Sequence, residues 1–362
     1  MAFQQIEELL PKVYRNFFPE FFQTTIPEET YATCFDCAMC QKSGPSFPGG
    51  FYFQPDVKCC TFHPTLPNYL VGGLLDNTEP LLEEGRRRIR EKISHRIGVT
   101  PHGISPPPKY SLLYEKHRLL TFGKGRSFLC PYYEKERGLC TVWPFRESVC
   151  ATYYCKTVAG EKGHSFWGTL RKYLSTVEKT LIQYTLYQMG WEAQKIIPPS
   201  SASELSPTLE ELEDQPPPDK TYRDWWGDWV GREEDFYKET YRLVAALTPT
   251  DFERITGIAS VIVLDELKQK HQEMVATKLP QKLKRNPKLQ VEKIADDRYA
   301  LTTYSPYNSL WVEGLVYMTL DFFDGERSNE EVCQLLQEHV EVEMSEDSLL
   351  RLYQFQVLVE AE

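Results

Sequence analysis

The sequence predicts an α+β protein with more than one domain, and three observations lead to this prediction. Nine of the ten cysteines lie between Cys34 and Cys155, in a region with few long periodic helices. Residues 165–189 and 251–278 carry apolar side chains at helical spacing. From residue 288 the apolar pattern changes to a period of two and then returns to helical spacing. We therefore expect an irregular, metal-stapled cysteine domain with helices, followed by a small mixed domain.

The composition narrows the class of protein. The chain has 362 residues, of which 41% are hydrophobic and 26% charged, so it can bury at least one substantial core. No run reaches the ~18 apolar residues that a membrane-spanning helix needs, and the stretch 310–323 is interrupted by Glu313 and Asp321. The net charge of −11 argues against general affinity for nucleic acid. We expect a soluble globular protein that neither spans a membrane nor binds nucleic acid.

Nine cysteines within one segment indicate either disulfide bonds or metal ligation. The nine residues are Cys34, Cys37, Cys40, Cys59, Cys60, Cys130, Cys140, Cys150 and Cys155. The amino-terminal residues lack the basic head, apolar core and small-residue cleavage site of a secretory signal, which predicts a cytoplasmic protein. A Cys-x-x-Cys turn presents two thiolates to one ion or cluster, whereas the adjacent Cys59 and Cys60 fit a simple disulfide framework poorly. We therefore predict that all nine ligate metal.

The number of thiols allows more than one metal centre. Four thiolates saturate one zinc ion or one iron–sulfur cluster, so nine are enough for two centres with one left over. The single Cys34-x-x-Cys37-x-x-Cys40 run is closer to cubane ligation than to the two separated pairs common in zinc sites. We favour one or two iron–sulfur clusters, with zinc as the alternative. His63 is a further candidate ligand, although a lone histidine is more often a structural residue.

Three cysteine segments match the pattern of a known family. They read Cys130-Pro-Tyr-Tyr, Cys140-Thr-Val-Trp-Pro-Phe-Arg146 and Cys150-Ala-Thr-Tyr-Tyr-Cys155. Over residues of roughly 30–180 the chain resembles the YkgJ-type cysteine-cluster family of zinc- or iron-chelating domains, which implies a metal-binding domain. Glu147 and Ala151 stand where the family pattern has proline and arginine, and eighteen residues separate Cys40 from Cys59.

The middle of the chain divides by composition. Residues 1–195 form the expected cysteine-cluster domain, and residues 196–220, rich in proline, serine and acids, are expected to be a linker. Residues 221–280 are expected to be helical, opening with an aromatic run that we interpret as packing surface. Within the first domain, residues 86–126 hold eleven Lys or Arg against Glu91 and Glu115. This basic segment is either a solvated surface or a site for an anionic ligand, such as an acidic peptide, a nucleotide or a phosphate.

The last region, residues 281–362, is expected to contain two strands followed by three helices. Period-two residues on either side of Asp296 and Asp297 predict a β-hairpin over residues 289–303. Residues 310–323 are predicted to form a helix that ends at the Asp-Gly turn of residues 324–325. Ser328 and Ser345 each begin a further helix, the first through a capping box with Glu331. Cys333, in the second helix, is expected to be a small buried apolar residue.

This order of elements and the Asp-Gly-x-x-Ser turn resemble a PqqD-like domain, the small winged-helix unit that recognises leader peptides. The resemblance implies a peptide or protein partner bound by strand addition to the hairpin edge or in the groove beside the third helix. The alternative is a packing module without a ligand.

The functional expectation combines the two resemblances. We expect an iron–sulfur, or other iron, cysteine-cluster protein that acts in redox or metal-assisted modification of a peptide or protein held by the PqqD-like domain. The alternative is a non-catalytic zinc-stapled adaptor that recruits a peptide or protein partner. The sequence identifies no catalytic acid, base or nucleophile, and the glycines of residues 122–127 lack the spacing of a phosphate-binding loop, so the expectation rests on the cysteines.

Overall fold

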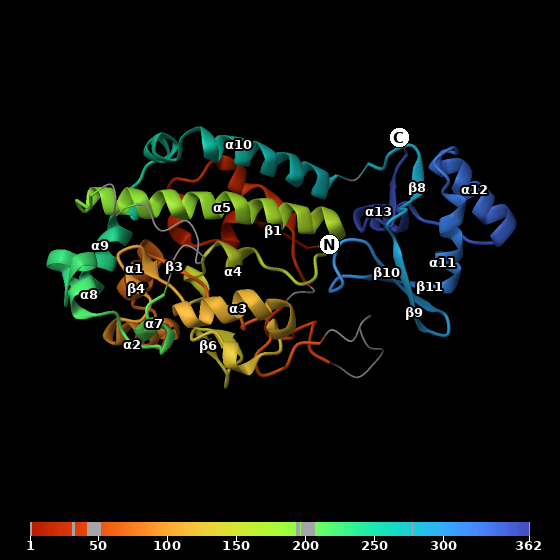
Figure 1. Ribbon diagram of the computed structural model, residues 1–362. Coiled ribbons are helices and arrows are strands. Elements are labelled where there is room, and N and C mark those ends of the chain that lie inside the picture. The colour runs from red at the N-terminus through yellow and green to blue at the C-terminus, as the bar shows by residue number, and fades with distance from the viewer. Residues whose placement is uncertain are drawn as a thin grey trace.

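The computed structural model describes residues 2–30, 33–41, 52–192, 196, 207–276 and 278–361. The chain is α+β, as the sequence predicts, with helices and short antiparallel sheets. Figure 1 shows a larger body, residues 2–276, and a smaller body, residues 278–361, which lies at one end of the larger one. The longest helices, α5 (Gly160–Gln188) and α10 (Pro249–Val275), run side by side along the larger body (Figure 1).

The larger body contains mostly helices and two-residue or three-residue strands. Its other helices are α1 (Asn68–Asp76), α2 (Glu83–His95), α3 (Pro108–Thr121), α4 (Ser148–Thr152), α7 (Leu209–Leu212), α8 (Asp219–Trp226) and α9 (Glu233–Ala245). Its strands are β1 (Phe3–Gln5), β2 (Thr25–Pro27), β3 (Leu66–Pro67), β4 (Val99–Thr100), β5 (Gly103–Ile104), β6 (Tyr133–Glu134) and β7 (Leu139–Cys140). Three short 3-10 helices, Ile6–Leu9, Lys12–Asn16 and Glu20–Gln23, connect β1 to its antiparallel partner β2.

Two apolar cores hold the larger body together. The first joins the amino-terminal aromatic residues to α5 and α10, with Phe17, Phe22, Phe166 and Leu267 almost fully buried. The second joins α1, α2 and the β6–β7 hairpin to α8 and α9, where Trp226 is fully buried. Because α8, α9 and α10 contribute to these cores, the helical segment 221–276 is an integral part of the larger body rather than a separate unit.

Within the expected linker, residues 196–220, the structure describes residue 196 and residues 207–220, and residues 197–206 lie outside the described residues. Thr208 and Glu211 form a capping box that begins α7, and α8 begins at Asp219 after Pro218, so part of the expected linker is helical. Local capping chemistry outweighs the polar composition there. Ile196 is buried, and its carbonyl faces the His102 ring nitrogen Nε2 at 3.1 Å.

The smaller body has two sheets and three helices. β9 (Gln290–Ala295), β10 (Arg298–Thr302) and β11 (Leu310–Glu313) form an antiparallel sheet in the order β11-β10-β9, and β8 (Leu283–Arg285) pairs with β12 (Leu358–Glu360). Its helices are α11 (Gly314–Thr319), α12 (Asn329–Val340) and α13 (Glu346–Gln354). The buried apolar residues of its core all come from residues 283–358.

The predicted hairpin and the predicted starts of the last two helices are confirmed. Ser328 Oγ accepts a hydrogen bond from the Glu331 amide, and Glu331 Oε2 accepts one from the Ser328 amide at 2.7 Å. The predicted helix over 310–323 is wrong in its first residues, because Leu310 and Val312 pair with β10 as strand β11. Cys333 is half-buried and packs against the core of the smaller body.

Candidate metal centre

The structure brings together cysteines from five segments of the larger body. All ten cysteines lie in the described residues and carry free thiols. The nine predicted ligands come from the loop 33–41, the turn at 59–60, the β6–β7 hairpin with the residues just before it, helix α4 and the segment after α4. Each of the nine lies within electrostatic range of at least one other of these cysteines.

Hydrogen bonds to backbone carbonyls hold the first cysteine loop against the segment that carries Cys59. Lys58 Nζ donates to the carbonyl of Cys34 at 2.6 Å and to the carbonyl of Gly138 at 3.2 Å. The Phe53 amide donates to the Met39 carbonyl at 2.8 Å, next to an isolated bridge between Cys40 and Phe53. Lys58, which is not one of the predicted ligands, therefore connects the loop 33–41 to the turn that carries Cys59.

The β6–β7 hairpin positions the middle cysteines. The Cys130 amide donates to the Cys60 carbonyl at 2.8 Å, and Cys140 pairs with Tyr133 across the hairpin. Cys130 is buried, and Cys60 and Cys140 pack against the same apolar core. This arrangement places three thiol-bearing residues from distant parts of the sequence around one hairpin.

Two buried carboxylates support the helix that carries Cys150. Glu147 caps α4 and accepts hydrogen bonds from the amides of Val149 at 2.6 Å and Cys150 at 2.9 Å. Glu178 of α5 accepts hydrogen bonds from the Ser148 amide at 2.6 Å and the Ser148 hydroxyl at 2.7 Å. Burial raises the pKa of both carboxyl groups. Neither role was predicted from the sequence, in which Glu147 stood out only as one of two departures, with Ala151, from the pattern of the resembled family.

Burial and mutual repulsion keep most of the thiols protonated. Burial is the main cause that raises the pKa of Cys34 to about 11 and of Cys40, Cys130 and Cys155 to about 12, and neighbouring cysteines raise these values further. Cys59 differs from these four, because a hydrogen bond from Cys60 lowers its pKa. Binding of a cation by this group of thiols must therefore release protons.

Arg146 lies near several of the cysteines. Its guanidinium carbon is 3.4 Å from the centroid of the Trp143 ring, and its Nη1 donates to the Cys150 carbonyl at 2.9 Å. Its positive charge lowers the pKa of Cys34, Cys59 and Cys140, in opposition to burial. Arg146 thus supplies compensating charge where several thiolates would form.

The donor set fits a thiophilic metal by its chemistry, because thiolates are the ligands of zinc and of iron–sulfur clusters. In the described part of the chain, no group of three or more His, Cys, Asp or Glu side chains is spaced to hold a metal ion. Ligation would therefore require these thiols to adopt other rotamers and to lose their protons.

His63 is buried beside the group. It lies edge-on to the Tyr110 ring, at 5.4 Å between centroids, and to the Tyr132 ring, at 5.8 Å. Neither His63 Nε2 nor the Tyr132 hydroxyl has a hydrogen-bond partner among the described residues, and burial lowers the pKa of the imidazole. A buried, unpartnered imidazole nitrogen is compatible with the expectation that His63 replaces a ligand.

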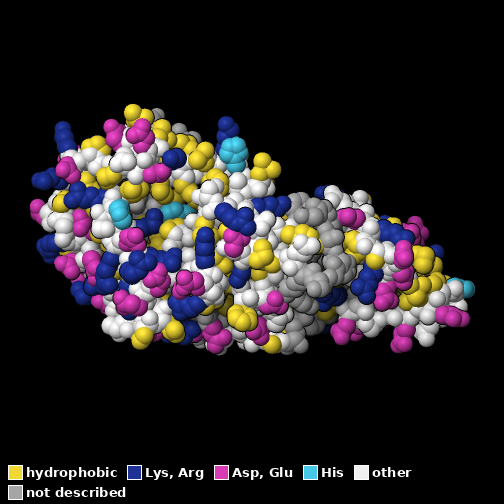
Figure 2. Space-filling model, turned by 90° about the horizontal axis from the view of Figure 1, so that it is seen from below, with side chains coloured by type: hydrophobic (Ala, Val, Ile, Leu, Met, Phe, Trp, Pro, Cys, Tyr) yellow, Lys and Arg dark blue, Asp and Glu magenta, His cyan; other side chains and the backbone are white. Residues whose placement is uncertain are grey.

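The basic segment 86–126 is mostly paired with acids inside the protein. Its ion-paired members are Arg86 with Glu83, Arg87 and Arg88 with Glu84, Arg90 with Glu234, Arg96 with Asp219, Lys109 with Asp214, and Arg126 with Asp56. Figure 2 shows the same interleaving of positive and negative side chains over one face of the larger body. An anionic ligand at this segment remains a prediction.

The smaller body contacts the larger one next to the cysteines, through the loop between β10 and β11. Asn308 Nδ2 donates to the carbonyl and hydroxyl oxygens of Thr157, at 3.1 and 3.2 Å. The Tyr307 ring lies 6.0 Å from the Phe53 ring, between centroids. Tyr307 is also within electrostatic range of Tyr153, which neighbours Cys155. The loop therefore reaches two of the segments that carry cysteines.

No family model, curated protein or solved structure matches this chain. Among its described residues, no helix has both the length and the apolar character needed to cross a bilayer. The function must be inferred from the residues themselves.

Proposed function

We propose that the chain is an iron–sulfur, or other iron, cysteine-cluster protein that acts in redox or metal-assisted modification of a peptide or protein held by its carboxy-terminal domain. The observation that carries this proposal is that nine free thiols from five segments lie within electrostatic range of one another, three of them also within range of Arg146. Protonated thiols can pack together without a metal. The burial of these cysteines and the nearby Arg146 guanidinium instead favour a site in which a metal neutralises the thiolates.

The protein residues have defined roles in this proposal. The nine cysteines would hold the metal, and Arg146 would offset the negative charge of the thiolates near it. Phe53, Phe122 and Tyr153 form a chain of ring contacts, at 5.3 and 5.4 Å, that shields this side of the group from water. When bound, an iron–sulfur cluster supplies one-electron transfer.

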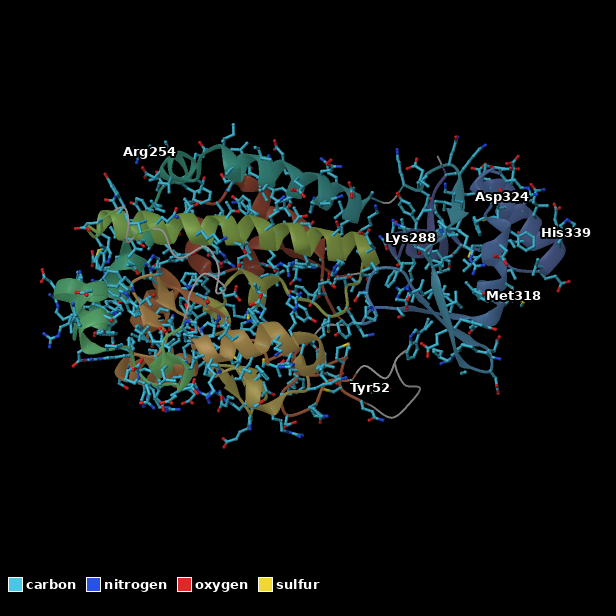
Figure 3. The ribbon with its side chains drawn as sticks, in the orientation of Figure 1. Tyr52, Arg254, Lys288, Met318, Asp324 and His339 are labelled. Atoms are coloured by element: carbon cyan, nitrogen blue, oxygen red, sulfur yellow. The ribbon has the colours of Figure 1, made fainter. Side chains whose placement is uncertain are left out.

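The smaller body is the proposed peptide-binding domain. Three antiparallel strands followed by α11, α12 and α13 support the resemblance to a PqqD-like winged-helix domain. β9 is an edge strand with mostly exposed residues, which suits strand addition. Leu315 and Met318 of α11 are exposed apolar side chains near this sheet, and Figure 3 marks Met318. The loop that contacts Thr157 and Phe53 would bring a bound peptide close to the cysteines.

The test is purification of the full chain without oxygen, followed by measurement of iron, sulfide and zinc and of visible absorption. We expect iron and sulfide, with absorption near ~400 nm from sulfur-to-iron charge transfer. Addition of a substrate peptide should perturb that absorption if the peptide reaches the cluster. A protein that contains zinc and no iron, with no visible band, would contradict the redox proposal.

The second candidate is a non-catalytic adaptor stapled by zinc. It is favoured by the irregular structure of residues 33–41 and 52–65, which form turns and one isolated bridge in the described chain. Metal often replaces the missing regular structure in such segments. Zinc content together with peptide binding would support this candidate.

A further inference from the structure

Helix α3 carries four exposed leucines around one lysine. Leu112 and Leu113 are 39% and 44% exposed, and Leu119 and Leu120 are 89% and 76% exposed. Lys116 is also exposed and stands three or four positions from each of these leucines, so the helical geometry places it among them. We call these five residues the leucine face. We propose that the leucine face binds an acidic, leucine-bearing helix of a partner protein, an interaction that requires no metal and goes beyond the proposed function.

The opposite side of α3 holds the helix on the larger body. The Tyr110 hydroxyl donates to the Thr61 carbonyl at 2.7 Å and accepts a hydrogen bond from the His63 amide at 2.9 Å. Tyr114, one turn later, stacks on Tyr110 with 5.6 Å between ring centroids, and both rings contact Phe128. These tyrosines attach α3 without its leucines, and no residue of α3, which is described in full, is buried. Single exposed leucines are ordinary, but four on one helix face form an apolar patch of the kind that binds a partner.

The charge on α3 specifies an acidic partner rather than any apolar one. The helix holds Lys109, Lys116 and Arg118 against a single acid, Glu115. Lys109 pairs with Asp214 at 3.0 Å, whereas Lys116 and Arg118 have no ion-pair partner among the residues that the structure describes. A partner that covered the leucines would also enclose the Lys116 ammonium, and an enclosed charge without a counter-ion is costly. A carboxylate between the partner's own apolar side chains removes this cost and selects the partner.

Helix α7 of the same chain shows which chemistry α3 accepts. Its residues, Leu209–Leu212, read Leu-Glu-Glu-Leu, and they contact α3. Asp214, just after α7, forms the ion pair with Lys109 in the first turn of α3. The leucines at the other end of α3, Leu119 and Leu120, are the most exposed of the four. The amino-terminal end of α3 therefore already holds an acidic, leucine-bearing helix, whereas the same chemistry at the carboxy-terminal end has no such occupant in the described chain.

The first test measures binding of a synthetic helix to the full-length chain by fluorescence anisotropy. The probe is an acidic peptide of about 20 residues, with leucines at helical spacing and glutamates between them, because shorter isolated helices are marginal in water. We expect the double variant L119Q/L120Q to bind it at least ~10-fold more weakly, because two leucines lose apolar contact. Ile258→Gln is the matched control and should bind as the native chain does, since Ile258 is 78% exposed in α10, which lies on the other side of α5 from α3 (Figure 1). A double variant that keeps the native affinity would overturn the proposal.

The second test exchanges the charges. Lys116→Glu should weaken binding of the acidic peptide at least ~10-fold, because like charges then meet across the interface. The same variant should bind a matched peptide, with lysines in place of the glutamates, more tightly than the native chain does. Both variants alter exposed side chains, so unchanged urea denaturation curves will show that they are folded. A native chain that binds neither peptide, or binds both equally, contradicts the proposal.

Two other occupants have distinct signatures. Binding to phosphatidylserine vesicles without binding of the acidic peptide would assign the leucine face to a membrane surface. A dimer in sedimentation velocity that L119Q/L120Q dissociates would assign it to a second copy of the chain. Either result would replace the proposed partner helix, whereas we expect a monomer that ignores the vesicles. These outcomes leave the proposed function untouched, because none of the measurements depends on metal.

Discussion

At the scale of single residues, charged side chains outside the cysteine pattern determine how the thiols are held. Lys58 adopts a left-handed backbone conformation, with φ of +50°, and uses its ammonium group to join the carbonyls of Cys34 and Gly138. Hydrogen bonds from a charged donor are stronger than neutral ones and are costly to remove when partly buried. The cysteine spacing could not reveal the role of Lys58, because its partners are 24 and 80 residues away.

Replacement of Lys58 by methionine should lower the free energy of unfolding by about 1–3 kcal/mol, because two carbonyls lose a charged donor. Urea denaturation measures this difference. The matched control is Lys116→Met in the exposed part of α3, which should change stability by less than about 0.5 kcal/mol. Equal effects of the two substitutions would show that Lys58 does not hold the loop.

Glu29 predicts a pH dependence of stability. Its buried carboxyl accepts hydrogen bonds from the Val158 amide at 2.8 Å and Trp167 Nε1 at 2.7 Å, and burial raises its pKa from 4.5 to about 7. Because the folded state holds this proton more tightly than the unfolded state, the stabilisation is present below pH 4.5 and is lost as pH rises to about 7.

Between pH 5 and pH 7.5, the native chain should therefore lose about 1–3 kcal/mol more stability than the variant Glu29→Gln. Denaturation curves at the two pH values measure this difference. The neighbouring exposed residue provides the control, since Glu28→Gln should keep the pH dependence of the native chain. A Glu29→Gln variant with an unchanged pH dependence would contradict the assignment.

At the scale of elements, sequence signals within a few residues predicted helices correctly, whereas strand pairing between distant segments could not be predicted. The periodic residues of α5 and the capping box of α12 are encoded within a few positions, and both helices form. β8 and β12 were not predicted, because Leu283 and Leu358 become strand residues only by pairing with distant segments. The same applies to the cysteines, whose neighbours depend on contacts between distant segments, such as the bond from the Cys130 amide to the Cys60 carbonyl.

The contact between α1 and α9 predicts a second stability effect. Gly72 of α1 lies so close to α9 that a Cβ atom would overlap the Tyr237 carbonyl oxygen. Gly72→Ala should therefore destabilise the chain by about 1–3 kcal/mol through overpacking. Thermal or urea denaturation measures the change. Gly168→Ala in α5 is the matched control, because a Cβ there meets nothing within 4 Å, and its effect should be neutral or stabilising by up to about 1 kcal/mol. A tolerated Gly72→Ala would mean that the two helices can separate at little cost.

At the scale of the whole molecule, the two bodies meet through a small set of specific contacts. Asn308 bonds to Thr157, and Gly160, with φ of +57°, approaches Phe355 so closely that a Cβ would stand 2.6 Å from its ring. Each body nevertheless has its own apolar core, and the core of the smaller body draws only on its own residues. We therefore expect each body to be stable by its own core. The contact between them, from Asn308 to Thr157, lies next to Cys155 in the sequence.

This organisation predicts that residues 281–362 fold without the larger body and without metal. The isolated fragment should unfold cooperatively with a chelator present, because its buried residues, among them Leu283, Leu336 and Leu352, pack against one another. The shorter fragment 288–362 is the matched control. It should be markedly less stable, because it lacks β8 and the Leu283 side chain. If the proposed peptide binding is correct, the amide signals of residues 289–304 in the longer fragment should shift in NMR spectra when a candidate peptide is added, because β9 is an edge strand of the sheet in the described residues. An unfolded 281–362 fragment would contradict the self-contained core, and a folded fragment that ignores every candidate peptide would favour a packing module over a recognition domain.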